Sequence, residues 1–177
     1  MTQPTQSIHW QISRAMLAAL QASADLAHLT WLDNPVHPAE IAEAGARVAW
    51  LEDGDDVANT LDKAAQQDIR VFSLRLGVAA MPTAAQLAQH AASPAALRLQ
   101  LRQQVDADIV AVKAVLLVAW QRWVQAATTG RRPLISSGGS LREGTRSGRI
   151  EGVSGDAAAL MTSIDCQYQE AARSLRG

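Results

Sequence analysis

The feature that most constrains the fold is a long apolar stripe in the second half of the chain. Its members recur every three or four residues: Leu97, Leu101, Val105, Ile109, Val112, Leu116, Trp120 and Trp123. Such steps place side chains on one face of an α-helix, so the stripe predicts helix over 93–126. Ser93 and Pro94 suit the N-cap and the first helical position. One helix or two are both consistent with the pattern, because Asp106 or Asp108 can restart a helix as an N-cap.

Three other segments alternate in their side chains, which is typical of strands in a sheet with one buried face. They are "ARVAWLE" at 46–52, "DIRVFSLRLGVAA" at 68–80 and "AALMTSIDCQYQEA" at 158–171. The second segment places Phe72, Leu74, Leu76 and Val78 on one side. The third does so with Leu160, Thr162, Ile164, Cys166 and Tyr168. We expect "DGDD" at 53–56 to end the first strand and 55–67 to form a polar connection, consistent with an elaborated hairpin.

The N-terminal part adds a further helix. Ile8, Ile12, Met16 and Leu20 recur every four residues and predict an amphipathic helix over 6–23. The two prolines of "DNPVHPAE" indicate a turn, and 83–91 suit a short helix. The order of helix, strands, helix and strand predicts an α+β fold, with an antiparallel or mixed β-sheet flanked by helices. The length of 177 residues predicts a single domain over 1–177, with an extended flexible loop at about 131–157.

That predicted loop carries most of the unusual charge. The whole chain has 16 basic and 17 acidic residues, a net charge of −1. By contrast, residues 131–149 hold five arginines against Glu143 alone, a local charge of +4. Gly139 and Gly144 have the spacing of a phosphate-binding P-loop, but the following lysine that contacts the phosphates is missing. The stretch therefore does not predict nucleotide binding.

Two interpretations of the arginine cluster remain, contact with nucleic acid and contact with a protein. Arginines bind nucleic-acid phosphates well, so a small nucleic-acid-binding regulator is one alternative. However, residues 131–149 contain no aromatic side chain for base stacking, and the chain as a whole is not basic. We therefore expect a protein partner and no specific nucleic acid, with Arg142, Arg146, Arg149 and Glu143 at the contact. Trp10 lies off the apolar stripe of its helix, and we include it as a candidate anchor for a neighbouring subunit. The alternative, a tryptophan that fills the core, is the more frequent role for this residue type.

Catalytic, metal and membrane motifs are weak in this sequence. The four histidines, His9, His28, His37 and His90, have no metal-binding spacing, and Cys166 is the only cysteine. The sequence contains no G-x-S-x-G motif, and the acidic run at 53–64 fails the EF-hand pattern. The apolar run 109–120 is too short to span a membrane. These observations predict a protein that is not an enzyme, with no catalytic residue, cofactor or metal. The N-terminus lacks a signal-peptide pattern, and we expect a reducing compartment.

The layout resembles a known family. The helix "IHWQISRAMLAALQAS", the strand "RVAWLEDGDD", the strand "DIRVFSLRLGVAA" and the helix "ADIVAVKAVLLVAWQRWV" follow in that order. A loop with "SLREG" then leads to "RIEGVSGDAAALMTSIDCQYQ". This order, over about residues 6–170, is similar to that of the tail-terminator, or tail-completion, proteins of long-tailed bacteriophages. The extra sequence at 83–105 departs from compact members of that family.

The resemblance implies a structural protein of the virion tail or neck, assembled in the host cytoplasm. Its members are α+β subunits of a ring, usually a homo-hexamer, that caps the tail tube, stops its polymerisation and joins it to the head-side connector. It implies no catalysis and no cofactor, and it carries over no catalytic residue. The alternative within structural proteins is another neck or head–tail connector protein.

Overall fold

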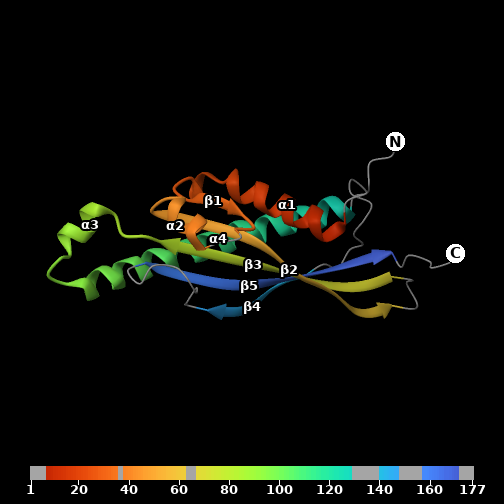
Figure 1. Cartoon of the computed structure of the whole chain (residues 1–177). Coiled ribbons are helices and arrows are strands. Elements are labelled where there is room, and N and C mark those ends of the chain that lie inside the picture. The colour runs from red at the N-terminus through yellow and green to blue at the C-terminus, as the bar shows by residue number, and fades with distance from the viewer. Residues whose placement is uncertain (1–6, 36–37, 63–66, 129–139, 148–156, 172–177) are drawn as a thin grey trace.

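The computed structural model describes residues 7–35, 38–62, 67–128, 140–147 and 157–171. The helices are α1 (Ile8–Gln21), the 3-10 turn η1 (Ala24–Leu26), α2 (Pro38–Glu43), α3 (Ala84–Gln89) and α4 (Pro94–Thr128). The strands are β1 (Thr30–Asp33), β2 (Arg47–Asp62), β3 (Gln67–Ala80), β4 (Ser140–Ser147) and β5 (Ala158–Ala171). Helices α1 and α4 cover one face of a long, strongly twisted β-sheet (Figure 1), and the short helix α2 packs on the other face.

The five strands form one mixed sheet in the order β1-β2-β3-β5-β4. Only β1 and β2 are parallel; β2 with β3, β3 with β5, and β4 with β5 are antiparallel. The connection between β1 and β2 contains α2, as a parallel pair requires a crossover. The predicted α+β fold with a mixed sheet is confirmed.

The long apolar stripe forms the centre of the helix layer. Helix α4 runs without a break over Pro94–Thr128, so Asp106 and Asp108 do not restart a helix. All eight residues of the stripe are buried. They pack with α1 residues Ile12, Met16 and Leu20 against the sheet residues Phe72, Leu74, Leu76, Val78 and Ile164, forming the main core. The buried faces that the helical and strand periodicities predict therefore pack against each other.

The opposite face of the sheet has its own smaller core. Ile41 of α2 packs there with Val48, Trp50 and Ala79, beside the partly buried Met81 and Met161. Since β2 is covered on both faces here, Val48, Ala49, Trp50 and Leu51 are all buried. This double burial explains the nearly continuous apolar run at the start of β2.

Two sequence predictions are wrong in detail, and one strand was not predicted. Strand β2 does not end at "DGDD": it continues to Asp62, with irregular register between Asp53 and Asp56 and between Ala58 and Thr60. The four-residue strand β1 was not predicted. Residues 140–147, predicted as part of a flexible loop, form the edge strand β4. The rest of that predicted loop, apart from Ala157, lies outside the described residues.

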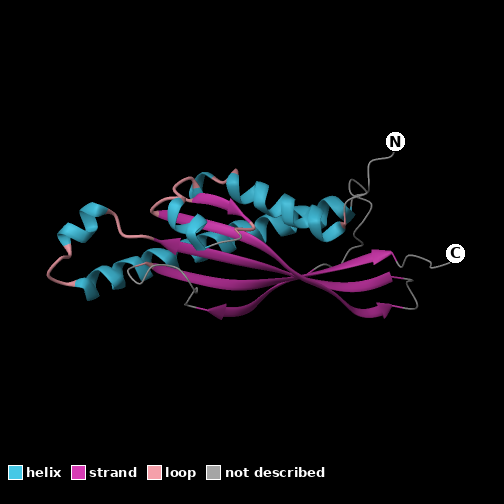
Figure 2. Cartoon of the chain, viewed as in Figure 1, coloured by secondary structure: helices cyan, strands magenta, loops and turns pink. Residues whose placement is uncertain are grey.

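The two ends of the molecule differ in structure. Helix α3 and the first turns of α4 project beyond the sheet at one end (Figure 2). At the other end lies the distal part of the β2–β3 hairpin, with the end of β5 beside it (Figures 1 and 2). The chain is thus elongated along the strand direction, with helices at one extreme and strands at the other.

Candidate interaction surface

Trp10 occupies an exposed position on α1. Its side chain is 40% exposed, which confirms the prediction that it lies off the buried stripe of the helix. The guanidinium of Arg14, one turn further along α1, lies 5.5 Å from the centre of the indole ring. This distance allows a cation–π interaction. Trp10 therefore presents a large aromatic surface to solvent while one side of the ring contacts Arg14.

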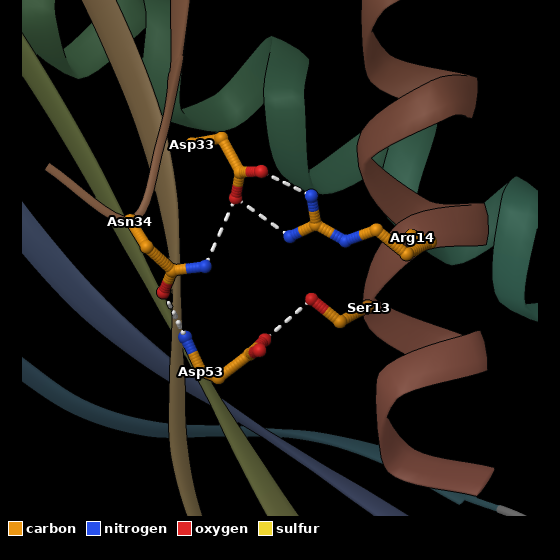
Figure 3. A network of polar contacts seen from close by, with 5 residues as sticks. All are labelled: Ser13, Arg14, Asp33, Asn34 and Asp53. Carbon is orange, nitrogen blue, oxygen red and sulfur yellow. Dashed lines mark hydrogen bonds and ion pairs between the residues drawn. The ribbon is translucent and has the colours of Figure 1, made fainter. Parts of the chain in front are cut away.

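Arg14 is itself held in place by the end of β1. Its guanidinium donates two hydrogen bonds to the carboxylate of Asp33, in a bidentate ion pair (Figure 3). The hydrogen bond from Arg14 lowers the pKa of Asp33, and the hydrogen bond to Asp33 raises the pKa of Arg14. A bidentate pair fixes the plane of the guanidinium. Asp33 therefore holds Arg14, and Arg14 in turn holds the exposed ring of Trp10 in place relative to the sheet.

The same junction of α1 with the sheet contains a second set of polar contacts. Ser13 of α1 is fully buried, and its hydroxyl donates to the carboxylate of Asp53 in β2. The side-chain oxygen of Asn34 accepts from the backbone N–H of Asp53 at 2.9 Å, and the Asn34 amide donates to Asp33 at 2.9 Å (Figure 3). Asn34 has a positive φ of 45°, a conformation that asparagine tolerates. These bonds attach α1 to β1 and β2, so the Trp10 surface rests on a rigid base.

Strand β4 carries three of the predicted contact residues. In the backbone register of β4 with β5, Arg142 lies opposite Asp165, Glu143 opposite Ile164, and Arg146 opposite Thr162. The register shifts between Glu143 and Arg146, as at a β-bulge. Arg149 lies outside the described residues. Trp10 is in the helix layer whereas β4 is an edge of the sheet, so the structure does not join these candidates into one site.

The sheet face opposite α1 and α4 is only partly covered. Beyond α2, the side chains described on this open face include the half-buried or exposed Val71, Ser73, Arg75, Ser163, Asp165 and Gln167. Ser73 donates to Asp165 across the β3–β5 pair at 2.7 Å. Arg75 is exposed and lies opposite Glu52 in the register of β2 with β3. The open face is therefore mainly polar, with side chains of both charges.

The outer side of the helix layer exposes several apolar side chains among polar ones. Helix α4 exposes Val110, Leu117 and Val118 there, each at least 45% exposed. A groove of about 610 Å³ runs between α4 and the C-terminal part of α1. Its lining is mostly small and apolar, with Ala19, Ala22, Ala111, Ala114, Val115 and Val118, and Ser23, Asp25 and Arg122 also border it. The molecule thus presents two chemically different surfaces on opposite sides of its layers.

One strongly buried charge lies inside this framework. Asp108 of α4 is 3% exposed and accepts two hydrogen bonds from Arg47, at the start of β2. His28, before β1, lies 2.9 Å from the same carboxylate through Nε2. A buried carboxylate needs such partners, because an unpaired charge in the interior is very costly. Asp108 therefore joins the long helix to the sheet, a role that its position in the stripe pattern does not reveal.

The structure does not indicate a reactive role for the thiol of Cys166. Its thiol is free and fully buried on the helix-covered face of β5, as predicted. Burial raises the pKa of the thiol, which opposes formation of the reactive thiolate. Within the described residues, no group of three His, Cys, Asp or Glu side chains could hold a metal ion. Among the helices of the described ranges, none has the length and hydropathy needed to cross a membrane.

Comparisons with known proteins give no family assignment. A scan of the chain against protein-family models found no match, and a search of curated proteins also found none.

Some features of these surfaces were not predicted from the sequence. The Asp33–Arg14 pair, the Ser13–Asp53 bond and the Asp108 cluster join residues far apart in the chain. The sequence predicts that Asp53 lies where the first strand ends, yet its carboxylate accepts a hydrogen bond from the buried Ser13. The one available signal was Ser13, a polar residue next to the buried Ile12 on an otherwise apolar helix face.

Proposed function

We propose that this chain is a structural virion protein: a subunit of a ring that caps the tail tube of a long-tailed bacteriophage. The ring ends tube polymerisation and joins the tail to the head-side connector. The proposal starts from the order of helices and strands, which is similar to that of tail-terminator proteins. In this proposal the protein acts in the virion tail or neck, is not an enzyme, and uses no cofactor.

The observation that carries the proposal is the pair of unlike surfaces. The open face of the sheet is polar and charged, whereas the outer side of α4 exposes Val110, Leu117 and Val118. A cyclic ring needs a heterologous contact, in which two different patches of each subunit meet. A ring that joins tube to connector also needs a separate surface for each partner. An elongated subunit with distinct faces and ends meets both requirements.

Trp10 supplies the candidate anchor for a protein contact. Tryptophan and arginine are enriched among the residues that dominate interface energies. Here Trp10 is exposed, and Arg14 and Asp33 hold it in a defined position. Less conformational freedom is then lost when a partner binds. In the proposed ring, this surface contacts a neighbouring subunit or the tube.

Particle imaging tests the proposal directly. The purified chain is imaged alone and after mixing with tail tubes assembled without it. We expect a closed ring, six-fold in the homo-hexamer that the resemblance implies, bound at tube ends, and no further tube growth. Rings that bind the head-side connector but leave tube growth unchanged would instead identify another neck protein. Tubes that elongate normally and carry no added density would contradict both functions.

A further inference from the structure

The outer side of the helix layer contains a stretch without exposed charge. Between Asp106 and Arg122, the exposed positions of α4 are all uncharged: Ala107, Val110, Ala114, Leu117, Val118 and Gln121. The adjoining turns of α1 expose Ala18, Gln21 and Ala22. We call these nine positions, with the groove between the two helices, the helix face. Apolar side chains that gather on one surface in this way are typical of a contact with another macromolecule.

The helix face is self-complementary in shape. Its groove, of about 610 Å³, is lined mostly by alanine and valine, and small side chains let a facing helix approach closely. Val110, Leu117 and Val118 of the same helix face are 61%, 47% and 45% exposed. They are medium-sized apolar side chains of the kind that fill such a groove. Each copy therefore carries both the receiving surface and the side chains that it can receive.

Opposite charges lie at the two ends of the groove. Asp25 of η1 and Arg122 of α4 both border it, and both are exposed. His28, shortly after Asp25, contacts Asp108, so η1 lies beside the Asp108 part of α4. Arg122 lies about four turns beyond Asp108, roughly 21 Å along the helix axis. The groove thus runs from a negative end to a positive end.

We propose that two copies of this chain pair through their helix faces, about a two-fold axis that crosses the groove. The contact is isologous, because the same patch of each copy meets itself. An axis across the groove places Asp25 of each copy opposite Arg122 of the other. An axis along the groove would place Asp25 on Asp25 and Arg122 on Arg122, and like charges repel each other.

The apolar and the charged parts of the helix face have different roles in this pair. Removal of the apolar side chains from water supplies most of the affinity. Exposed ion pairs add little binding energy, but they distinguish one orientation from another. Asp25 and Arg122 therefore select the orientation of two copies that their apolar side chains hold together.

This inference goes beyond the proposed function, because it concerns the free chain and not the assembled ring. A cyclic ring needs two different patches on each subunit, whereas this pair uses one patch twice. The pair covers Val110, Leu117 and Val118 until another contact replaces it. Assembly through the outer side of α4 would then begin with release of the pair.

Leu117→Glu tests the apolar part of the contact. Self-association of the purified chain is measured by analytical ultracentrifugation. We expect the wild type to form a dimer, and the variant to dissociate at least about tenfold more readily, because a carboxylate would be buried against apolar side chains. Leu99→Glu is the matched control: Leu99 is 59% exposed on the same helix but lies outside the helix face, so the wild-type affinity should remain.

Charge reversal tests the orientation. Asp25→Arg and Arg122→Asp each replace two attractive contacts of the pair by two repulsive ones, and each should weaken the dimer about tenfold at low ionic strength. An equimolar mixture of the two variants regains opposite charges at both contacts, and so does one chain that carries both substitutions. Both samples should recover the wild-type affinity. Arg98→Asp, outside the helix face, should have no effect, and thermal unfolding confirms that each variant is folded.

Each outcome supports or contradicts the pair. Loss in both charge variants with recovery in the mixture and in the double variant supports it. A wild-type chain that stays monomeric would overturn it and leave the helix face to a different partner. An unchanged dimer in Leu117→Glu, or charge variants that do not recover, would overturn it too. Tube binding by the same samples separates the two proposals. A dimer that meets these tests but does not bind tubes contradicts the proposed function alone, and tube capping by a chain that never dimerises contradicts the pair alone.

Discussion

The indole ring of Trp50 lies directly over Gly77, its partner in the register of β2 with β3. A methyl group at Gly77 would overlap the ring. Trp50 is fully buried, and its Nε1 donates to Glu52 at 2.9 Å, so the ring has little freedom to move aside. Glycine at 77 is therefore required by close packing and not by backbone conformation. This contact is part of the second core, between α2 and the sheet.

We expect Gly77→Ala to lower the free energy of unfolding by about 1–3 kcal/mol, the usual cost of overpacking a well-filled core. Denaturant unfolding of the variant and the wild type measures the difference. A double-mutant cycle with Trp50→Leu provides the control, because a smaller side chain at 50 leaves room for the added methyl group. An equal cost of Gly77→Ala in both backgrounds would contradict the contact.

Asp108→Asn should be strongly destabilising. The substitution leaves Arg47 without its buried counter-charge, and we expect a loss of about 3 kcal/mol in the free energy of unfolding. This value is at the low end for breaking a buried pair, because Arg47 keeps partial exposure to solvent. Glu43→Gln, at the exposed end of α2, should change stability by less than about 0.5 kcal/mol. Similar losses in the two variants would show that the Asp108 cluster does not hold α4 to the sheet.

The buried thiol makes stability depend on pH in the alkaline range. The pKa of Cys166 in the folded chain is raised above its ordinary value of 9.0, so the unfolded chain loses the thiol proton first as pH rises. The unfolded state then binds fewer protons, and the free energy of unfolding falls above about pH 9. Cys166→Ala should unfold with a shallower dependence between pH 9 and 10. Parallel curves for the two proteins would be evidence against a protected thiol.

Trp10→Ala should separate stability from assembly. The exposed ring contributes little to the core, so we expect a stability loss below about 1 kcal/mol, mainly from the Arg14 contact. Loss of an aromatic anchor should weaken the ring or tube contact by about 2 kcal/mol, or roughly thirtyfold. Quantitative binding of tubes by the variant measures this effect, and Trp10→Phe should retain most of the affinity. Wild-type affinity for the alanine variant would remove Trp10 from the interface.

The arginine cluster gives a prediction about joining. Replacing Arg142, Arg146 and Arg149 with serine should leave the subunit folded but reduce its joining to tube or connector. Replacing all three with lysine keeps the charge and should preserve much of that joining. Yields of finished tails and infectious particles provide the measurement, and unchanged yields for the serine variant would reject the hypothesis. A salt-dependent affinity for DNA, lost in the same variant, would favour the nucleic-acid alternative instead.

Much of the fold is predictable from the sequence because periodicity is local. The step of the stripe from Leu97 to Trp123 identifies the long helix and its buried face. The alternation around Phe72 and Ile164 identifies the strands and the side that packs on the helices. The place of Trp10 off the stripe is consistent with its exposure but did not distinguish an exposed ring from one that fills the core. Each of these predictions depends only on residues within one element.

The tertiary structure decided what depends on pairing between distant segments. Asp53, Asp55 and Asp56 have the composition of a turn, yet pairing with β3 carries β2 past them to Asp62. Strand β4 has weak strand character, and pairing with β5 orders its backbone. In the sequence, Asp108 is consistent with the start of a helix. Only the folded chain shows that its carboxylate contacts Arg47 and His28. By itself the sequence determined the periodic elements and their buried faces, since those arise from neighbours along the chain. Strand order, hairpin length and the partners of buried charges arise from contacts between segments, which only the folded chain brings together.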